Sequence, residues 1–106
     1  MEIVNEVYAN CKHFPKEELF GMRSQATRAA VSIAANIAEG SAKNSEREYK
    51  QYLECALGSA LELETHLLIV KMQKWFPDDV VDGLLARVVE EQRMVSSFVR
   101  RLKLEA

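Results

Sequence analysis

A long helical pattern without a proline is the feature that most limits the folds open to this chain. It runs from residue 45 to residue 74, and about thirty residues of α-helix are about 45 Å long. Ser45 with Glu48 three residues later forms a capping-box pattern, which is typical of a helix N-terminus. The whole chain of 106 residues has only four Gly and two Pro. A sheet sandwich of this length needs more turn residues, so the sequence predicts an all-α protein.

Three further segments carry apolar residues at helical spacing. Pro15 and Pro77 are well placed to begin helices, and Gly40 is predicted to follow the end of one, since Gly favours that position. The first pattern begins at the first residue without a capping residue. With the long segment, the predicted helices cover residues 1–12, 16–39, 45–74 and 78–104. Short connections between them favour an antiparallel up-down-up-down four-helix bundle, with residues 1–106 as a single domain.

The 45–74 segment has more apolar surface than one helix of a small bundle needs. One seam follows steps of three and four residues and consists of Leu53, Ala56, Ala60, Leu63, Leu67 and Val70. A second seam beside it consists of Leu57, Leu61 and Leu68. The second seam predicts that this helix also buries surface against another subunit.

The charge balance, the apolar runs, the N-terminus and the cysteines argue against a dedicated nucleic-acid-binding domain, a membrane protein and a secreted protein. The formal net charge is −2, whereas a dedicated nucleic-acid-binding domain is usually basic. No apolar run is long enough to span a membrane, and the N-terminus has no signal-peptide pattern. Cys11 and Cys55 have no paired spacing and are expected to be free thiols with small buried side chains, in a cytoplasmic protein.

No group of residues matches a known catalytic or metal-binding pattern. A di-iron site in a four-helix bundle requires a Glu-x-x-His pair on each of two helices. The only histidines are His13 and His66, and neither fits such a pair, so His66 is interpreted as a partly exposed helix residue. No glycine-rich phosphate loop and no nucleophile with a base partner is present. The sequence therefore predicts no metal, no cofactor and no enzymatic activity.

A polar stripe on the 16–39 segment does not fit a simple amphipathic helix. Its members recur in steps of three and four residues and are Gln25, Arg28, Ser32, Asn36 and Glu39. One interpretation is a polar network that fixes helix register, with Arg28 or Glu39 pairing to charged groups on other helices such as Glu62. A second is a ligand or phosphate site on Arg28 and Gln25. A third is an ordinary solvated face.

Three motifs of the chain resemble one protein family. Residues 28–40 read RAAVSIAANIAEG and residues 52–65 read YLECALGSALELET. These resemble the patterns R-A-x-x-S-I-x-x-N-I-A-E-G and L-x-x-A-x-G-S-x-x-E-L-E-T of the four-helix bundle family named after the 23S rRNA intervening-sequence protein. Residues 14–22, FPKEELFGM, are similar to a third segment of that family. The resemblance covers about residues 3–70.

The resemblance implies a four-helix bundle that assembles as a ring-like homopentamer, with a first helix shortened in this chain. It attaches no enzymatic activity to the fold. A related branch assists reverse transcriptases and binds nucleic acid through a basic surface, and this chain departs from that branch in being acidic. Because of that branch, RNA or DNA is still one candidate partner. The residues proposed to contact it are Arg23, Arg28, Arg47 and Lys50. The alternative is an adaptor for a protein partner, with no nucleic-acid binding.

Overall fold

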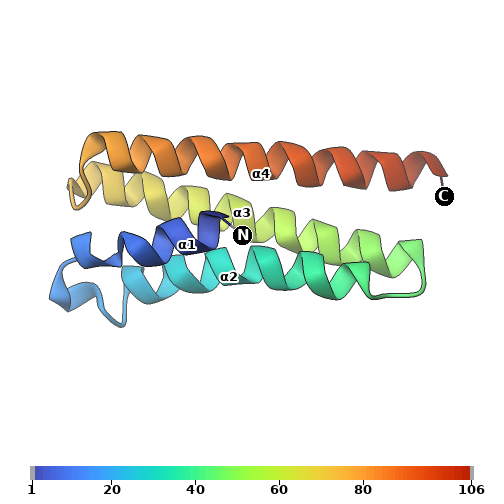
Figure 1. Ribbon diagram of the computed structural model, residues 1–106, viewed down its shortest axis with the longest axis horizontal. Coiled ribbons are helices and arrows are strands. Elements are labelled where there is room, and N and C mark those ends of the chain that lie inside the picture. Colours follow the sequence, from blue (N-terminus) through green and yellow to red (C-terminus); the bar gives the residue numbers. More distant parts are fainter. Residues whose placement is uncertain (1, 106) are drawn as a thin grey trace.

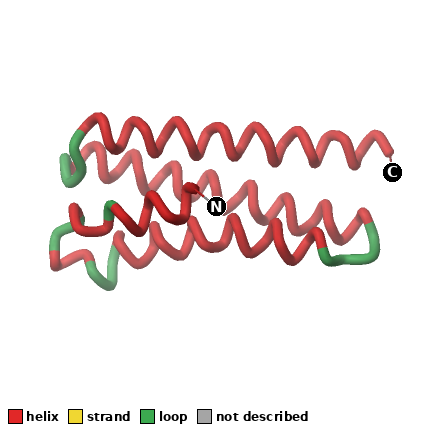
Figure 2. Tube along the Cα trace, in the orientation of Figure 1, coloured by secondary structure: helices red, strands yellow, loops and turns green. Residues whose placement is uncertain are grey.

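The computed structural model describes residues 2–105, which form helices joined by short turns (Figures 1 and 2). The elements are α1 (Glu2–Ala9), η1 (Cys11–His13), η2 (Lys16–Glu18), α2 (Met22–Ser41), α3 (Glu46–Gln73) and α4 (Asp78–Glu105). Successive α-helices run in opposite directions (Figure 1). No strand occurs among the described residues. The predicted all-α antiparallel four-helix bundle is confirmed.

The short helix α1 covers only one half of the three long helices. It contacts α2 and α4 and lies beside one end of the bundle (Figure 1). In that half, buried side chains from all four helices join one apolar core, which includes Ile3, Ile33 and Leu67. A smaller core in the other half is built from Leu53 and Ala56 of α3 with Val95 and Val99 of α4.

Ion pairs and apolar contacts together hold α1 in place. Ile3 and Val7 are buried in the larger core. On the outer side, Arg87 of α4 lies 2.7 Å from a Glu2 carboxylate oxygen and 2.6 Å from a Glu6 carboxylate oxygen. Residue 1 of the predicted helix 1–12 lies outside the described residues, and the chain leaves the α-conformation after Ala9 to form η1.

The predicted start of the second helix at residue 16 is wrong. Pro15 is followed by a single 3₁₀ turn, η2, and the α-helix begins only at Met22. The Glu18 side chain accepts a hydrogen bond from the Met22 N–H at 2.9 Å. A Cβ at Gly21 would lie 2.8 Å from that same carboxylate oxygen. Glu18 therefore acts as a cap for α2 instead of lying in its first turn, and Gly21 leaves the space for it.

The predicted role of Gly40 is also wrong. Gly40 lies inside α2, which continues to Ser41, and no glycine among the described residues has a positive φ angle. A Cβ at this position would lie 2.8 Å from Tyr52 Cβ and 2.9 Å from Tyr49 Cδ1. Gly40 is therefore needed for the close approach of α2 to α3, and the helix ends without it.

The ends of α3 follow known capping chemistry. The Ser45 hydroxyl accepts a hydrogen bond from the Glu48 N–H at 3.1 Å, as the capping-box pattern predicts. At the other end, Lys74 is left-handed, with φ 60°. The Trp75 N–H bonds the Val70 carbonyl at 3.2 Å, and the Lys74 N–H bonds the Lys71 carbonyl at 3.1 Å. This pair of bonds is a Schellman motif with Lys in the position where Gly is usual.

Candidate functional site: a polar seam and an apolar face

The middle of the predicted polar stripe forms a hydrogen-bonded link between α2 and α3. The Ser32 and Ser59 hydroxyl oxygens lie 2.8 Å apart. The Asn36 side-chain amide donates to the Ser32 hydroxyl at 3.0 Å and to the Ser32 carbonyl at 2.8 Å. All three side chains are half-buried. Partly desolvated hydrogen bonds of this kind favour one register between two helices.

The ends of the polar stripe remain exposed. Gln25, Arg28 and Glu39 are exposed to solvent. Among the described side chains, neither Arg28 nor Glu39 forms an ion pair. Glu62, a predicted partner, instead has a carboxylate oxygen 3.6 Å from His66 Nε2. The stripe therefore divides into a structural middle and a solvated periphery.

An open groove runs beside Arg28. It has a volume of about 540 Å³, and its polar lining side chains are Tyr8, Thr27, Arg28, Ser32, Ser59 and Glu62. The groove offers four hydroxyl groups and one charge of each sign to a polar group. A ligand site on Arg28 and Gln25 stays a prediction, and Gln25 is not among the residues that line this groove.

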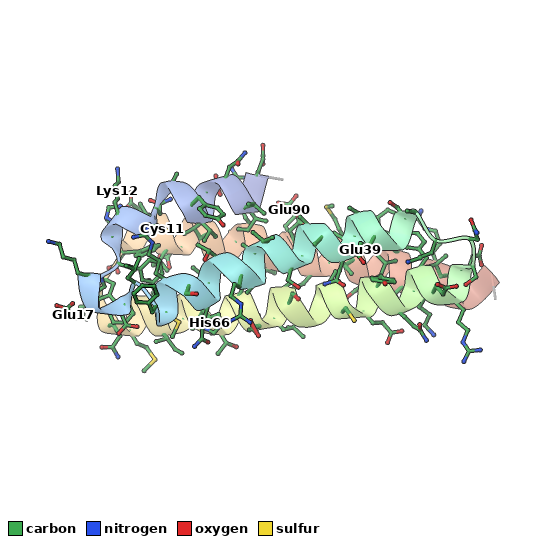
Figure 3. The ribbon with its side chains drawn as sticks, turned by 90° about the horizontal axis from the view of Figure 1, so that it is seen from below. Cys11, Lys12, Glu17, Glu39, His66 and Glu90 are labelled. Atoms are coloured by element: carbon green, nitrogen blue, oxygen red, sulfur yellow. The ribbon has the colours of Figure 1, made fainter. Side chains whose placement is uncertain are left out.

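His66 is buried, contrary to the expectation of a partly exposed residue. Its exposed fraction is 8%, and neither ring nitrogen has a hydrogen-bond partner in the described structure. The distance to Glu62 is within ion-pair range but too long for a hydrogen bond. Figure 3 shows His66 on α3 and Glu39 in the other half of the bundle. The i to i+4 spacing from Glu62 was visible in the sequence, but the burial of the ring was not.

The four basic residues proposed for nucleic acid lie in two separate pairs. Arg23 and Arg28 lie in the first half of α2, whereas Arg47 and Lys50 lie in the first turns of α3. Since α2 and α3 are antiparallel, the two pairs are about 20 Å or more apart along the helix axes. Lys50 Nζ also lies 3.8 Å from a Glu54 carboxylate oxygen. One protomer therefore does not gather these four charges on one patch.

The second apolar seam of α3 faces outward. Leu61 and Leu68 are 49% and 47% exposed, and Met72, one turn further along α3, is 75% exposed. Leu57 at the other end of the seam is half-buried. We call Leu57, Leu61, Leu68 and Met72 the α3 face. It is an unpartnered apolar line on the protomer, of the kind that soluble proteins use for association.

The cysteines and acidic residues form no metal site in the described part of the chain. Both cysteines are free thiols, but only Cys11 is buried, whereas the expected burial of Cys55 is wrong. Between residues 2 and 105, no group of three or more His, Cys, Asp or Glu side chains could hold a metal ion. No helix in that range is long and apolar enough to cross a membrane.

Two ionisable groups have shifted pKa values. Burial, followed by the negative charge of Glu90, raises the pKa of Glu91 on α4. The pKa of Lys71 is raised by its hydrogen bond to Asp82, in which Lys71 Nζ lies 2.7 Å from the Asp82 carboxylate. Neither group lies in the polar stripe.

Comparison with known families decides where this fold belongs. The sequence model of the 23S rRNA-intervening sequence protein family matches residues 1–97. The chain belongs to this family. The match confirms the resemblance carried by the motifs at residues 28–40 and 52–65, and it extends into α4.

A solved structure agrees with the fold of this family member. It is a protein of unknown function from the S23 ribosomal protein family of Bacteroides thetaiotaomicron. The sequences are 22% identical, the match covers 92% of each chain, and the TM-score is 0.86. Similarity at this identity concerns the fold alone. The search of curated proteins finds no match.

Proposed function

We propose that this 23S rRNA-intervening sequence family protein is a non-enzymatic interaction module that works as a homo-oligomer. The observation that carries the proposal is the α3 face. Leu61 and Leu68 of this face are about half exposed on the protomer, although burying a leucine stabilises by about 1.5–3 kcal/mol. The family resemblance adds a ring of five copies as the expected assembly.

The native mass of the purified protein tests this proposal. We expect a mass close to five times 12.0 kDa by light scattering. The double variant Leu61→Gln/Leu68→Gln is expected to be a folded monomer, because both side chains are already partly solvated. The control is Met94→Gln/Phe98→Gln on α4, where the exposure is similar and the mass is expected to stay unchanged. A monomeric wild-type protein would refute self-association.

Nucleic acid is the partner we propose for the assembled ring. Support comes from the exposure of Arg23, Arg28 and Arg47, which a cyclic assembly repeats in every copy. The same repetition applies to the acidic groups, so five copies carry about −10 from the −2 of each chain. Any binding must therefore depend on local patches.

A salt titration with a short labelled RNA tests this partner. When a protein binds RNA phosphates, the logarithm of the binding constant falls linearly with the logarithm of the salt concentration. The variant Arg23→Gln/Arg28→Gln should reduce the slope, whereas the control Lys16→Gln/Lys74→Gln should not. Absence of binding at low salt would leave the alternative, an adaptor for a protein partner. The negative net charge of the chain favours that alternative.

A further inference from the structure

The turn between η2 and α2 presents the most exposed large apolar side chain of the described residues. Phe20 is 92% exposed, and the adjacent Leu19 is 44% exposed. The turn itself is well fixed, because the Gly21 N–H bonds the Glu18 carbonyl at 3.1 Å and the Glu18 carboxylate accepts from the Met22 N–H. A fixed turn that holds an aromatic ring in solvent is a preorganised backbone for a contact, since little backbone freedom is lost on binding.

A groove whose lining includes apolar side chains, and which could therefore take up an aromatic ring, lies between α3 and α4. Its volume is about 460 Å³ and its lining residues are Leu57, Leu61, Val89, Gln92, Arg93, Ser96 and Arg100. The leucines belong to the α3 face. Gln92 bonds a Glu64 carboxylate oxygen at 2.9 Å, which links the two helices at the groove. The groove therefore combines apolar side chains with a hydrogen-bonded link between its two helices.

Glu17 near the turn and the two arginines of the groove carry opposite charges. Residues 16–18 hold one Lys and two Glu, and Glu17 lies exposed at the end of the bundle (Figure 3). The residues that line the groove include two Arg and no acidic group. Neither Arg93 nor Arg100 is in an ion pair with another described side chain. Both remain available for a carboxylate, or for the face of an aromatic ring.

We propose that Phe20 of one copy inserts into the α3–α4 groove of the next copy, with Glu17 beside Arg93 and Arg100. Turn and groove are different surfaces of one chain, so the contact is heterologous, and repetition of it closes a ring when the rotation permits. The occupant is a second copy because the chain itself carries both complementary parts. This inference rests on the proposed self-association and names the contact that produces it.

Disulfide trapping tests the contact directly. In a Cys55→Ser background, the double variant Glu17→Cys/Arg93→Cys, which keeps the Phe20 ring, should oxidise to a ladder of linked chains that ends at the ring size. Within one chain the two positions lie about 20 Å apart along the bundle, too far for a disulfide. Neither single variant should give linked chains. Dimers of Glu17→Cys alone, or no ladder from the double variant, would overturn the proposed contact.

A second measurement uses the exposed ring itself. Because Phe20 makes little contact within the protomer, Phe20→Ser should leave the helical circular dichroism unchanged while weakening association roughly thirtyfold or more, as for an aromatic hot spot. Tyr8→Ser, at an exposed aromatic on α1, is the control and should associate normally. If Phe20→Ser keeps the wild-type oligomer on dilution, this contact is wrong while self-association stands. A monomeric wild type would refute both.

Discussion

Gly40 and Gly58 are two helical glycines with opposite surroundings. A Cβ at Gly40 would overlap Tyr52 and Tyr49, whereas nothing lies within 4 Å of a Cβ at Gly58. Replacing an exposed helical Gly by Ala gains about 1 kcal/mol of helix propensity. Overpacking at a tight contact costs about 1–3 kcal/mol. The sign of the change in stability should therefore differ between the two positions.

We expect Gly58→Ala to raise the free energy of unfolding by about 1 kcal/mol. Gly40→Ala is expected to lower it by about 1 kcal/mol, because the overlap with Tyr52 Cβ exceeds the gain in propensity. Urea unfolding followed by circular dichroism measures both. An equal gain from the two variants would show that α2 and α3 can separate at no cost at Gly40.

Glu91 gives the fold a pH dependence whose sign follows from its environment. Burial raises the pKa of Glu91 in the folded protein above its ordinary value of 4.5. Between those two pKa values the folded state binds more protons than the unfolded state, so stability falls as pH rises. Below the unfolded pKa both states are protonated and the effect vanishes.

We therefore expect Glu91→Gln to be more stable than the wild type at neutral pH and equal to it near about pH 3. Urea midpoints at the two pH values measure the difference. Glu39→Gln, at an exposed carboxylate of α2, is the control and should not show this pattern. A Glu91→Gln variant that is less stable than the wild type at neutral pH would contradict the assigned cause.

At the level of the elements, the polar seam couples α2 to α3. Ser32→Ala and Ser59→Ala each remove one partner of a 2.8 Å hydrogen bond. We expect each to cost about 1 kcal/mol, and the double variant to cost less than their sum because the partners contact each other. Arg28→Ala is exposed and should change stability by less than about 0.5 kcal/mol.

Unfolding free energies of the two single variants, the double variant and Arg28→Ala measure this coupling. The cycle should be run on the monomeric Leu61→Gln/Leu68→Gln background, so that contacts between copies do not enter. If the stability costs of Ser32→Ala and Ser59→Ala are additive, the hydrogen bond between the two hydroxyl groups contributes nothing to the pairing of the helices.

The elements also show where sequence patterns succeed. The bounds of α3 follow from Ser45 and from the break before Pro77, both local signals. The start of α2 was mispredicted because Pro15 with Glu17 and Glu18 is a typical helix start, and only the folded turn shows Glu18 capping Met22. Periodicity placed Ser32 and Asn36 on one side of a helix. It could not identify Ser59, 27 residues further along the chain, as their partner.

At the scale of the whole molecule, the sequence identified surplus apolar surface but not its distribution. The outward α3 face agrees with the second seam predicted from spacing. The limited reach of α1 follows from the predicted bounds 1–12. The exposure of Phe20 was not predicted, because it depends on how the 14–22 segment folds back onto the bundle. Under the proposed contact, self-association depends on the geometry of this turn, and the concentration dependence of unfolding tests self-association without a structure of the assembly.

Unfolding of a homo-oligomer releases free chains, so its midpoint depends on concentration. Between about 1 and about 100 μM chain, a pentamer that unfolds directly to single chains gains about 2 kcal/mol per chain. The thermal midpoint of the wild type should rise on the order of 10 °C over that range. Leu61→Gln/Leu68→Gln should show a midpoint independent of concentration, whereas Met94→Gln/Phe98→Gln should follow the wild type. A wild-type midpoint that does not move with concentration would mean that the protomer is stable alone and that the α3 face contributes nothing to the fold.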